Sequence, residues 1–64
     1  MELKYVEDLV PKSSYFSRTS GTNFIVLELN KKFTEIKIGE NGKLKTLSFG
    51  KFSKQYFKDG IVVN

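Results

Sequence analysis

Cysteine and histidine are both absent from this 64-residue chain. Their absence excludes a disulfide framework and the usual zinc ligand sets, and it removes thiol and imidazole chemistry from any mechanism. No run of apolar residues approaches the roughly 20 that are needed to cross a bilayer, so no membrane partner is expected. The N-terminal sequence MELKYVEDLVPK is mixed and acidic, unlike a secretory signal, and it predicts a cytoplasmic location.

Residues suited to catalysis are equally scarce. Without histidine or cysteine, a general base would have to be one of seven carboxylates or a lysine with a shifted pKa. Glu7 and Asp8 are adjacent and lie on an expected turn, where a solvated role fits them best. Gly39, Gly42 and Gly50 lack the spacing and the following helix of a phosphate-binding loop. The sequence therefore predicts a protein that is not an enzyme, with no cofactor, no metal site and no small-molecule substrate.

The residues that are present suit one small domain. Hydrophobic residues make up 39% of the chain and include nine aromatic side chains, a composition typical of globular proteins. A chain of this length is near the size at which a core alone barely stabilises a fold. We expect a single domain over residues 1–64, with a leader turn at 1–12 and a barrel over 13–64.

A β-hairpin is the clearest element in the sequence. Within the expected strands 33–39 and 43–49, residues 35–38 and 46–49 alternate apolar with polar side chains, and Asn41-Gly42 lies between the two runs. An Asn-Gly step flanked by such runs is the strongest short-range signal for a hairpin. The hairpin also places lysines on its outer surface.

Two registers remain open for this hairpin. A two-residue loop pairs Glu40 with Lys43, whereas a three-residue loop that ends in a bulged Gly42 pairs Gly39 with Lys43. The two registers differ by one residue, which moves every side chain of the return strand to the other face of the sheet. The two-residue loop is favoured because it groups four apolar side chains on one face: Ile36, Ile38, Leu47 and Phe49.

Shorter elements precede the hairpin. Residues 5–10 form a helical or irregular turn that Pro11 ends, because the residue before a proline is disfavoured in the α region. Residues 13–18 are a strand candidate in which two adjacent aromatic side chains point to opposite faces. Residues 24–29, FIVLEL, are a nearly continuous apolar run, and they predict a strand that is buried on both faces or strongly bent through the core.

A helical segment and a last strand follow the hairpin. In residues 51–57, KFSKQYF, the spacing of four between Phe52 and Tyr56 is helical and directs both rings inward. Asp59-Gly60 predicts a turn, and residues 61–63 form a short final strand. Five short strands with a helical turn before the last one are the order of elements in an SH3-like barrel.

Three stretches carry a resemblance to that family. VEDLVPKSSY, residues 6–15, resembles the opening of small bacterial and phage SH3-like proteins, although lysine or serine stands where their turn has glycine. The hairpin ENGKLKTLSF and the aromatic turn GKFSKQYF also resemble such domains. The resemblance implies a mainly-β fold, a five-stranded SH3-like barrel of the stand-alone type that mobile elements encode, and no particular activity. The alternative is an α+β fold in which a three- or four-stranded antiparallel sheet packs on one helix.

Positive charge is concentrated in the C-terminal half. From residue 31 to residue 58 there are eight lysines and two glutamates, a balance of +6, whereas residues 1–30 carry three basic and four acidic side chains, a balance of −1. Such asymmetry is typical of proteins with anionic partners. The candidate contacts are the lysines of the hairpin and the helical segment: Lys37, Lys43, Lys45, Lys51, Lys54 and Lys58.

Aromatic residues add further candidates, because a barrel of this size cannot bury every ring. Three of them are expected to stack on a base or fill a pocket of a partner: Tyr15, Phe33 and Phe57. Two hypotheses follow. The first is a nucleic-acid-binding module that uses the lysine-rich surface, and the second is a protein-binding adaptor or inhibitor that docks through an aromatic patch or a free strand edge.

Overall fold

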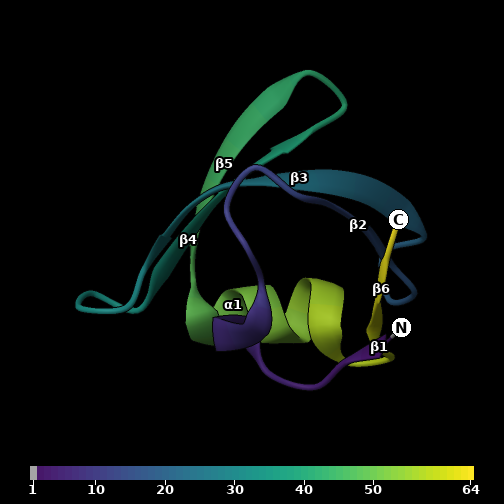
Figure 1. The fold of residues 1–64 in the computed structure, drawn as a ribbon, viewed down its shortest axis with the longest axis horizontal. Coiled ribbons are helices and arrows are strands. Elements are labelled where there is room, and N and C mark those ends of the chain that lie inside the picture. The colour runs from purple at the N-terminus through teal and green to yellow at the C-terminus, as the bar shows by residue number, and fades with distance from the viewer. Residues whose placement is uncertain (1) are drawn as a thin grey trace.

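A computed structural model describes residues 2–64, which form one antiparallel sheet and a short helical segment. The strand order is β1-β6-β2-β3-β4-β5, and the strands are β1 (Glu2–Leu3), β2 (Ser14–Ser17), β3 (Thr22–Asn30), β4 (Glu35–Glu40), β5 (Lys43–Ser48) and β6 (Ile61–Val63). The helical elements are a 3-10 turn, η1 (Val6–Asp8), a single α-helical turn, α1 (Phe49–Phe52), and a π-helical turn, η2 (Ser53–Phe57). In Figure 1, strands β2–β5 arch over α1 and η2, which together form the helical segment.

The prediction of a mainly-β chain is confirmed. All five predicted strands are present, the helical segment precedes the last of them, and β1 adds a short sixth strand by pairing with β6. Part of the predicted leader therefore lies in the sheet. Within residues 2–64, the outer strands β1 and β5 do not pair with each other, so the sheet is open.

The central hairpin has the two-residue loop. Glu40 pairs with Lys43, and Asn41 and Gly42 take φ angles of 52° and 76°. A type I′ turn requires positive φ at both central positions, which asparagine tolerates and glycine adopts without strain. The register favoured from the sequence is therefore confirmed.

Strand β3 has only one buried face, so of the two alternatives predicted for this apolar run, burial on both faces is wrong and a bent strand agrees with the structure. Phe24 and Val26 are buried, whereas Ile25 and Leu27 are 39% and 37% exposed. The pairing with β4 shifts between Val26 and Glu28, as expected for a β-bulge. The bulge bends β3 around the core and leaves its outward apolar side chains uncovered.

Three aromatic rings form the centre of the core. Phe52 and Tyr56 stack with ring centroids 5.1 Å apart, and Phe24 meets them edge-on at 5.6 and 5.5 Å. The predicted inward direction of Phe52 and Tyr56 is thus confirmed. Large aromatic side chains supply much of the buried area available to a small domain. The other buried apolar residues surround these rings: Val6, Leu9, Tyr15, Val26, Ile36, Ile38 and Ile61.

Candidate functional site

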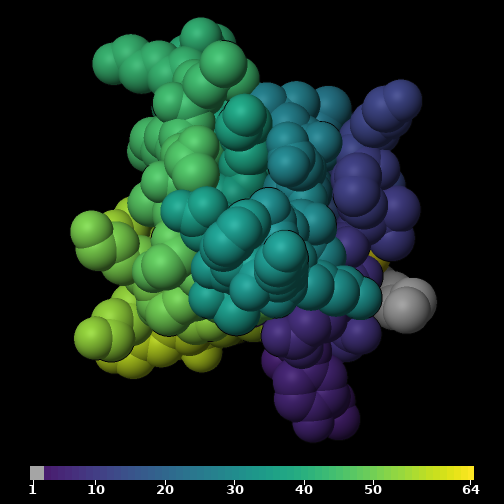
Figure 2. Space-filling model, turned by 90° about the vertical axis from the view of Figure 1, so that its left-hand side faces the viewer, coloured from purple at the N-terminus to yellow at the C-terminus, as the bar shows by residue number. Residues whose placement is uncertain are grey.

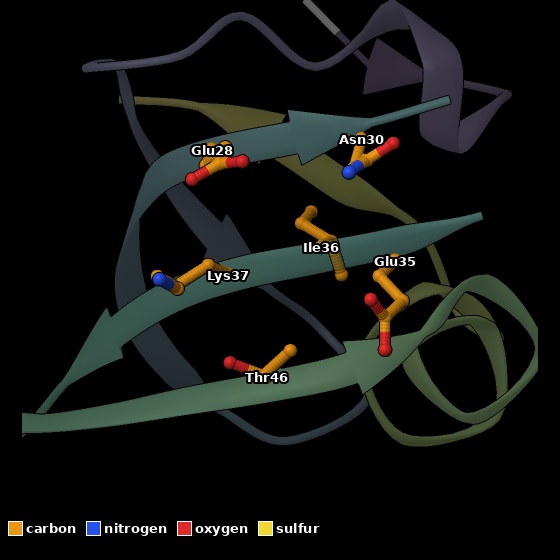
Figure 3. A pocket seen from close by; sticks show the side chains of 6 residues that line it. All are labelled: Glu28, Asn30, Glu35, Ile36, Lys37 and Thr46. Atoms are coloured by element: carbon orange, nitrogen blue, oxygen red, sulfur yellow. The ribbon is translucent and has the colours of Figure 1, made fainter. Parts of the chain in front are cut away.

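The six candidate lysines lie on two faces of the sheet and on the helical segment. Lys37 is on the outer face, where Figure 3 shows it between Glu28 and Thr46. Lys43 and Lys45 lie on the inner face, because they pair with residues of β4 whose side chains are buried. The remaining three are exposed on or just after the helical segment: Lys51, Lys54 and Lys58. The sheet thus separates Lys37 from the other five.

Lys45 belongs to a polar network that ties the hairpin to the helical segment. Its Nζ donates to Oε1 of Glu40 at 2.8 Å, and the Tyr56 hydroxyl donates to the same oxygen at 2.9 Å. The Thr22 hydroxyl donates to the other carboxylate oxygen. Burial raises the pKa of the Glu40 carboxyl, but these hydrogen bonds outweigh it and hold that pKa below the ordinary value. The charge of Lys45 is therefore partly used inside the protein.

The three candidate aromatic residues have different environments. Tyr15 is buried in the core. Phe33 is 64% exposed in the β3–β4 loop, where Nζ of Lys32 lies 5.6 Å from its ring centroid. Phe57 is partly buried and meets the core ring of Phe52 edge-on at 6.2 Å. Only the last of these candidates lies in a groove together with lysines.

That groove, of about 380 Å³, runs between the N-terminal segment and the helical segment. In Figure 2, residues 4–8, in purple, and the helical segment, in yellow-green, border the lower part of the face shown. Within residues 2–64, neither of the two lysines at the groove forms an ion pair. Aromatic and basic side chains dominate the lining, with one carboxylate: Lys4, Tyr5, Glu7, Phe49, Phe57 and Lys58.

Local packing fixes the N-terminal side of the groove. Val6, at the start of η1, and Leu9, directly after its end, are both buried, and the Leu9 N–H donates to the Val6 carbonyl at 3.1 Å. The Val10 N–H then donates to the Tyr15 hydroxyl at 2.8 Å, which ties the segment to β2. Residues 4–5 are therefore held beside the helical segment.

The helical side of the groove starts at a capped helix terminus. The hydroxyl of Ser48 accepts a hydrogen bond from the Lys51 N–H at 3.2 Å, so α1 begins directly after β5. Phe49 and Phe57 follow at the two ends of the helical segment, and each is partly buried against the core. Each of these two rings thus combines an anchored side with a side that lines the groove.

A second pocket, of about 200 Å³, lies on the outer face of β3, β4 and β5. Figure 3 shows that side chains from all three strands border it. Two of its lining residues, Glu28 and Glu35, are acidic, and only Lys37 is basic. This pocket therefore lacks the positive charge that a phosphate requires.

Comparisons with protein families, with curated proteins and with solved structures find no match to this chain. None of the helices described in residues 2–64 has the length and apolar character to span a membrane. The same residues contain no group of three or more His, Cys, Asp or Glu side chains placed to hold a metal ion. Functional inference therefore starts from the geometry of the groove.

No local pattern marks Lys4 and Tyr5 as site residues, because they lie in the predicted leader turn. An indirect signal is the apolar pair Val6 and Leu9, whose spacing of three matches the period of a 3-10 turn. Such a pair indicates that one side of the turn is buried, which brings the preceding residues to the body of the domain. The segment that they meet is more than 40 residues away in sequence, and no sequence period records that contact.

Proposed function

We propose that this protein is a non-enzymatic module that binds single-stranded nucleic acid along the groove between residues 4–7 and the helical segment. The observation that carries the proposal is that three aromatic rings and two lysines line one groove. Aromatic side chains stack on bases of any sequence, and lysines contact the phosphates that link them. Stacking requires unpaired bases, so a single strand fits this lining better than a duplex.

The charge distribution of β5 and the helical segment supports the same proposal. Between Asn41 and Lys58 the chain carries five lysines and no Asp or Glu. Lys51 and Lys54 are exposed on this segment and extend the positive charge beyond the groove. A strand whose bases occupy the groove would meet these cations with its backbone, and Glu7 is the one carboxylate at the lining.

We also propose that the open sheet is a variant of the SH3-like barrel. Three observations support this: the antiparallel order of β6-β2-β3-β4-β5, the helical segment before the last strand, and the bulge that bends β3. The fold adds nothing to the choice of ligand, because barrels of this type host unrelated binding functions. The choice rests on the groove.

Titration of a labelled single-stranded oligonucleotide, followed by fluorescence anisotropy at about 50 and 200 mM salt, tests the function. We expect Lys58→Gln to weaken binding and to flatten the slope of log affinity against log salt by about 0.7. Tyr5→Ala is expected to weaken binding by about 1–3 kcal/mol without a change in that slope, because it removes a stacking ring and no charge.

Lys37→Gln is the matched control, because it removes one exposed lysine from the opposite face of the sheet. If Lys37→Gln and Lys58→Gln have equal effects, binding depends on net charge and not on the groove. Absence of micromolar binding by the wild-type protein at low salt contradicts the proposed function altogether.

A further inference from the structure

Strand β5 has a free backbone edge. It pairs with β4 alone and is the last strand of the sheet within residues 2–64. In a hairpin with a two-residue loop, the residues that flank the loop exchange both backbone hydrogen bonds, and alternate residues then point their N–H and C=O groups away from the partner strand. Since Lys43 flanks the loop, Leu44 and Thr46 direct their backbone groups to the open edge. These groups can receive an added strand.

The outer side of this edge is apolar at its hairpin end. Leu44 is 75% exposed, and it lies in register with Gly39, which in turn lies in register with Ile25. A Cβ atom on Gly39 would lie 3.2 Å from a methyl group of Ile25 and 3.8 Å from one of Leu27. The absence of a side chain at Gly39 thus lets apolar groups of β3 cover β4. On the outer face, the exposed apolar side chains of Ile25 and Leu44 therefore lie on either side of Gly39, and Leu44 is at the edge of the sheet.

The inner side of the same edge is basic. Lys43 and Lys45 lie on that side of β5, and Lys51 follows in the helical turn that begins where the strand ends. Only Lys45 of these three has an ion pair within the part of the chain that the structure describes. Apart from Glu40, which pairs with Lys45, the chain has no carboxylate between Lys37 and Lys58.

We propose that β5 binds an extended acidic segment of a protein partner by strand addition, with acidic side chains alternating with apolar ones. An added strand directs alternate side chains to opposite faces of the sheet. The acidic side chains meet the inner lysines, and the apolar side chains cover Leu44. This surface shares only Lys51 with the cations proposed to flank the groove, and the inference does not require nucleic-acid binding.

A second copy of the chain suits this edge less well. Two β5 strands that pair antiparallel around Leu44 set Lys43 opposite Lys45, and pairing around Lys45 sets that residue opposite itself. Pairing around Thr46 sets no lysine directly opposite another, but it still gathers Lys43 and Lys45 of both copies on one face of the joined strands. Like charges directly opposite each other destabilise a strand pair, and lysines on edge strands commonly prevent self-association. Charge complementarity therefore selects an acidic partner.

The test uses a synthetic peptide of about seven residues, a usual strand length, with glutamate at alternate positions and valine or threonine between them. We expect saturable binding by NMR titration, with slowed hydrogen exchange at the Leu44 and Thr46 amides. A peptide of the same composition with its glutamates in one block is expected to bind roughly tenfold more weakly or not at all, because it cannot match both faces.

Two changes then test the backbone contacts. Thr46→Pro removes a free N–H at the edge and leaves the hydrogen bonds to β4 in place. We expect it to weaken binding of the alternating peptide roughly tenfold, while nucleic-acid binding stays unchanged. N-methylation of the peptide amides that face β5 makes the same test with the unaltered protein. Equal binding of the alternating, block and N-methylated peptides overturns the proposal, as does a wild-type dimer that Thr46→Pro dissociates.

Discussion

Glu40 is the residue at which β3, the hairpin and the helical segment meet. Its carboxylate accepts hydrogen bonds from Thr22 of β3, Lys45 of β5 and Tyr56 of η2. Because the carboxylate is mostly removed from water, losing one donor leaves part of its hydrogen-bonding capacity unsatisfied. This network is therefore a link between elements, and it makes the stability of the protein depend on pH.

We predict that stability falls as the pH drops below about 4.5. The pKa of Glu40 is lower in the folded protein than the ordinary value of 4.5, so the unfolded chain takes up the proton first as the pH falls. The stabilisation is present above the unfolded pKa and is lost as the pH falls through the folded one. Glu40→Gln is expected to lower the free energy of unfolding by about 1–3 kcal/mol at neutral pH. It is also expected to reduce the loss of stability at low pH, which is the acid limb of the stability profile.

Urea unfolding between about pH 7 and pH 3 measures both effects. Glu35→Gln is the control, because Glu35 lies on the same strand but is exposed. We expect it to leave the neutral stability within about 0.5 kcal/mol and to keep the acid limb. An unchanged acid limb in Glu40→Gln contradicts the assignment of the limb to Glu40.

Among the elements, the turn of the β4–β5 hairpin and the helix α1 each contain a glycine with open space around it. Gly42 has a φ of 76° and Gly50 lies in α1, and a Cβ atom on either would meet no atom within 4 Å apart from the adjacent residues and, at Gly50, the backbone of its own helix. Any effect of adding a methyl group at these positions therefore comes from the backbone and not from packing. The two sites allow one chemical change to be tested in two conformations.

We predict opposite signs for the same substitution at these two sites. Gly42→Ala is expected to lower stability by about 1 kcal/mol, because the left-handed conformation is strained for a residue with a Cβ atom. Gly50→Ala is expected to raise stability by about 0.5–1 kcal/mol, because alanine loses less entropy in a helix than glycine. Thermal and urea unfolding measure both, and a stabilising Gly42→Ala contradicts the type I′ turn.

The molecule as a whole depends on one aromatic core. Phe52 has no exposed surface and contacts the rings of three other aromatic residues. We predict that Phe52→Ala loses about 3–5 kcal/mol, which is enough to unfold much of a domain this small. Phe33→Ala is the matched control: its ring is 64% exposed, and its loss is expected to change stability by under about 0.5 kcal/mol. Circular dichroism melts separate the two, and a folded Phe52→Ala protein would place Phe52 outside the core.

Several features of this protein follow from the sequence by itself. The Asn41-Gly42 turn, the hairpin register and the inward direction of Phe52 and Tyr56 were predictable because each depends on residues close together in the chain. The turn type is set by two backbone conformations, and helical spacing brings residues four apart to one side. Strand alternation likewise indicates which residues of a hairpin share a face.

Only the tertiary structure decided which distant segments meet. It buries Tyr15, brings Tyr5 to the helical segment and leaves Ile25 uncovered, and none of these outcomes is recorded in a local period. The physical reason is that burial depends on how a bent sheet and a helical segment share limited core volume, and that volume is filled by residues far apart in the chain.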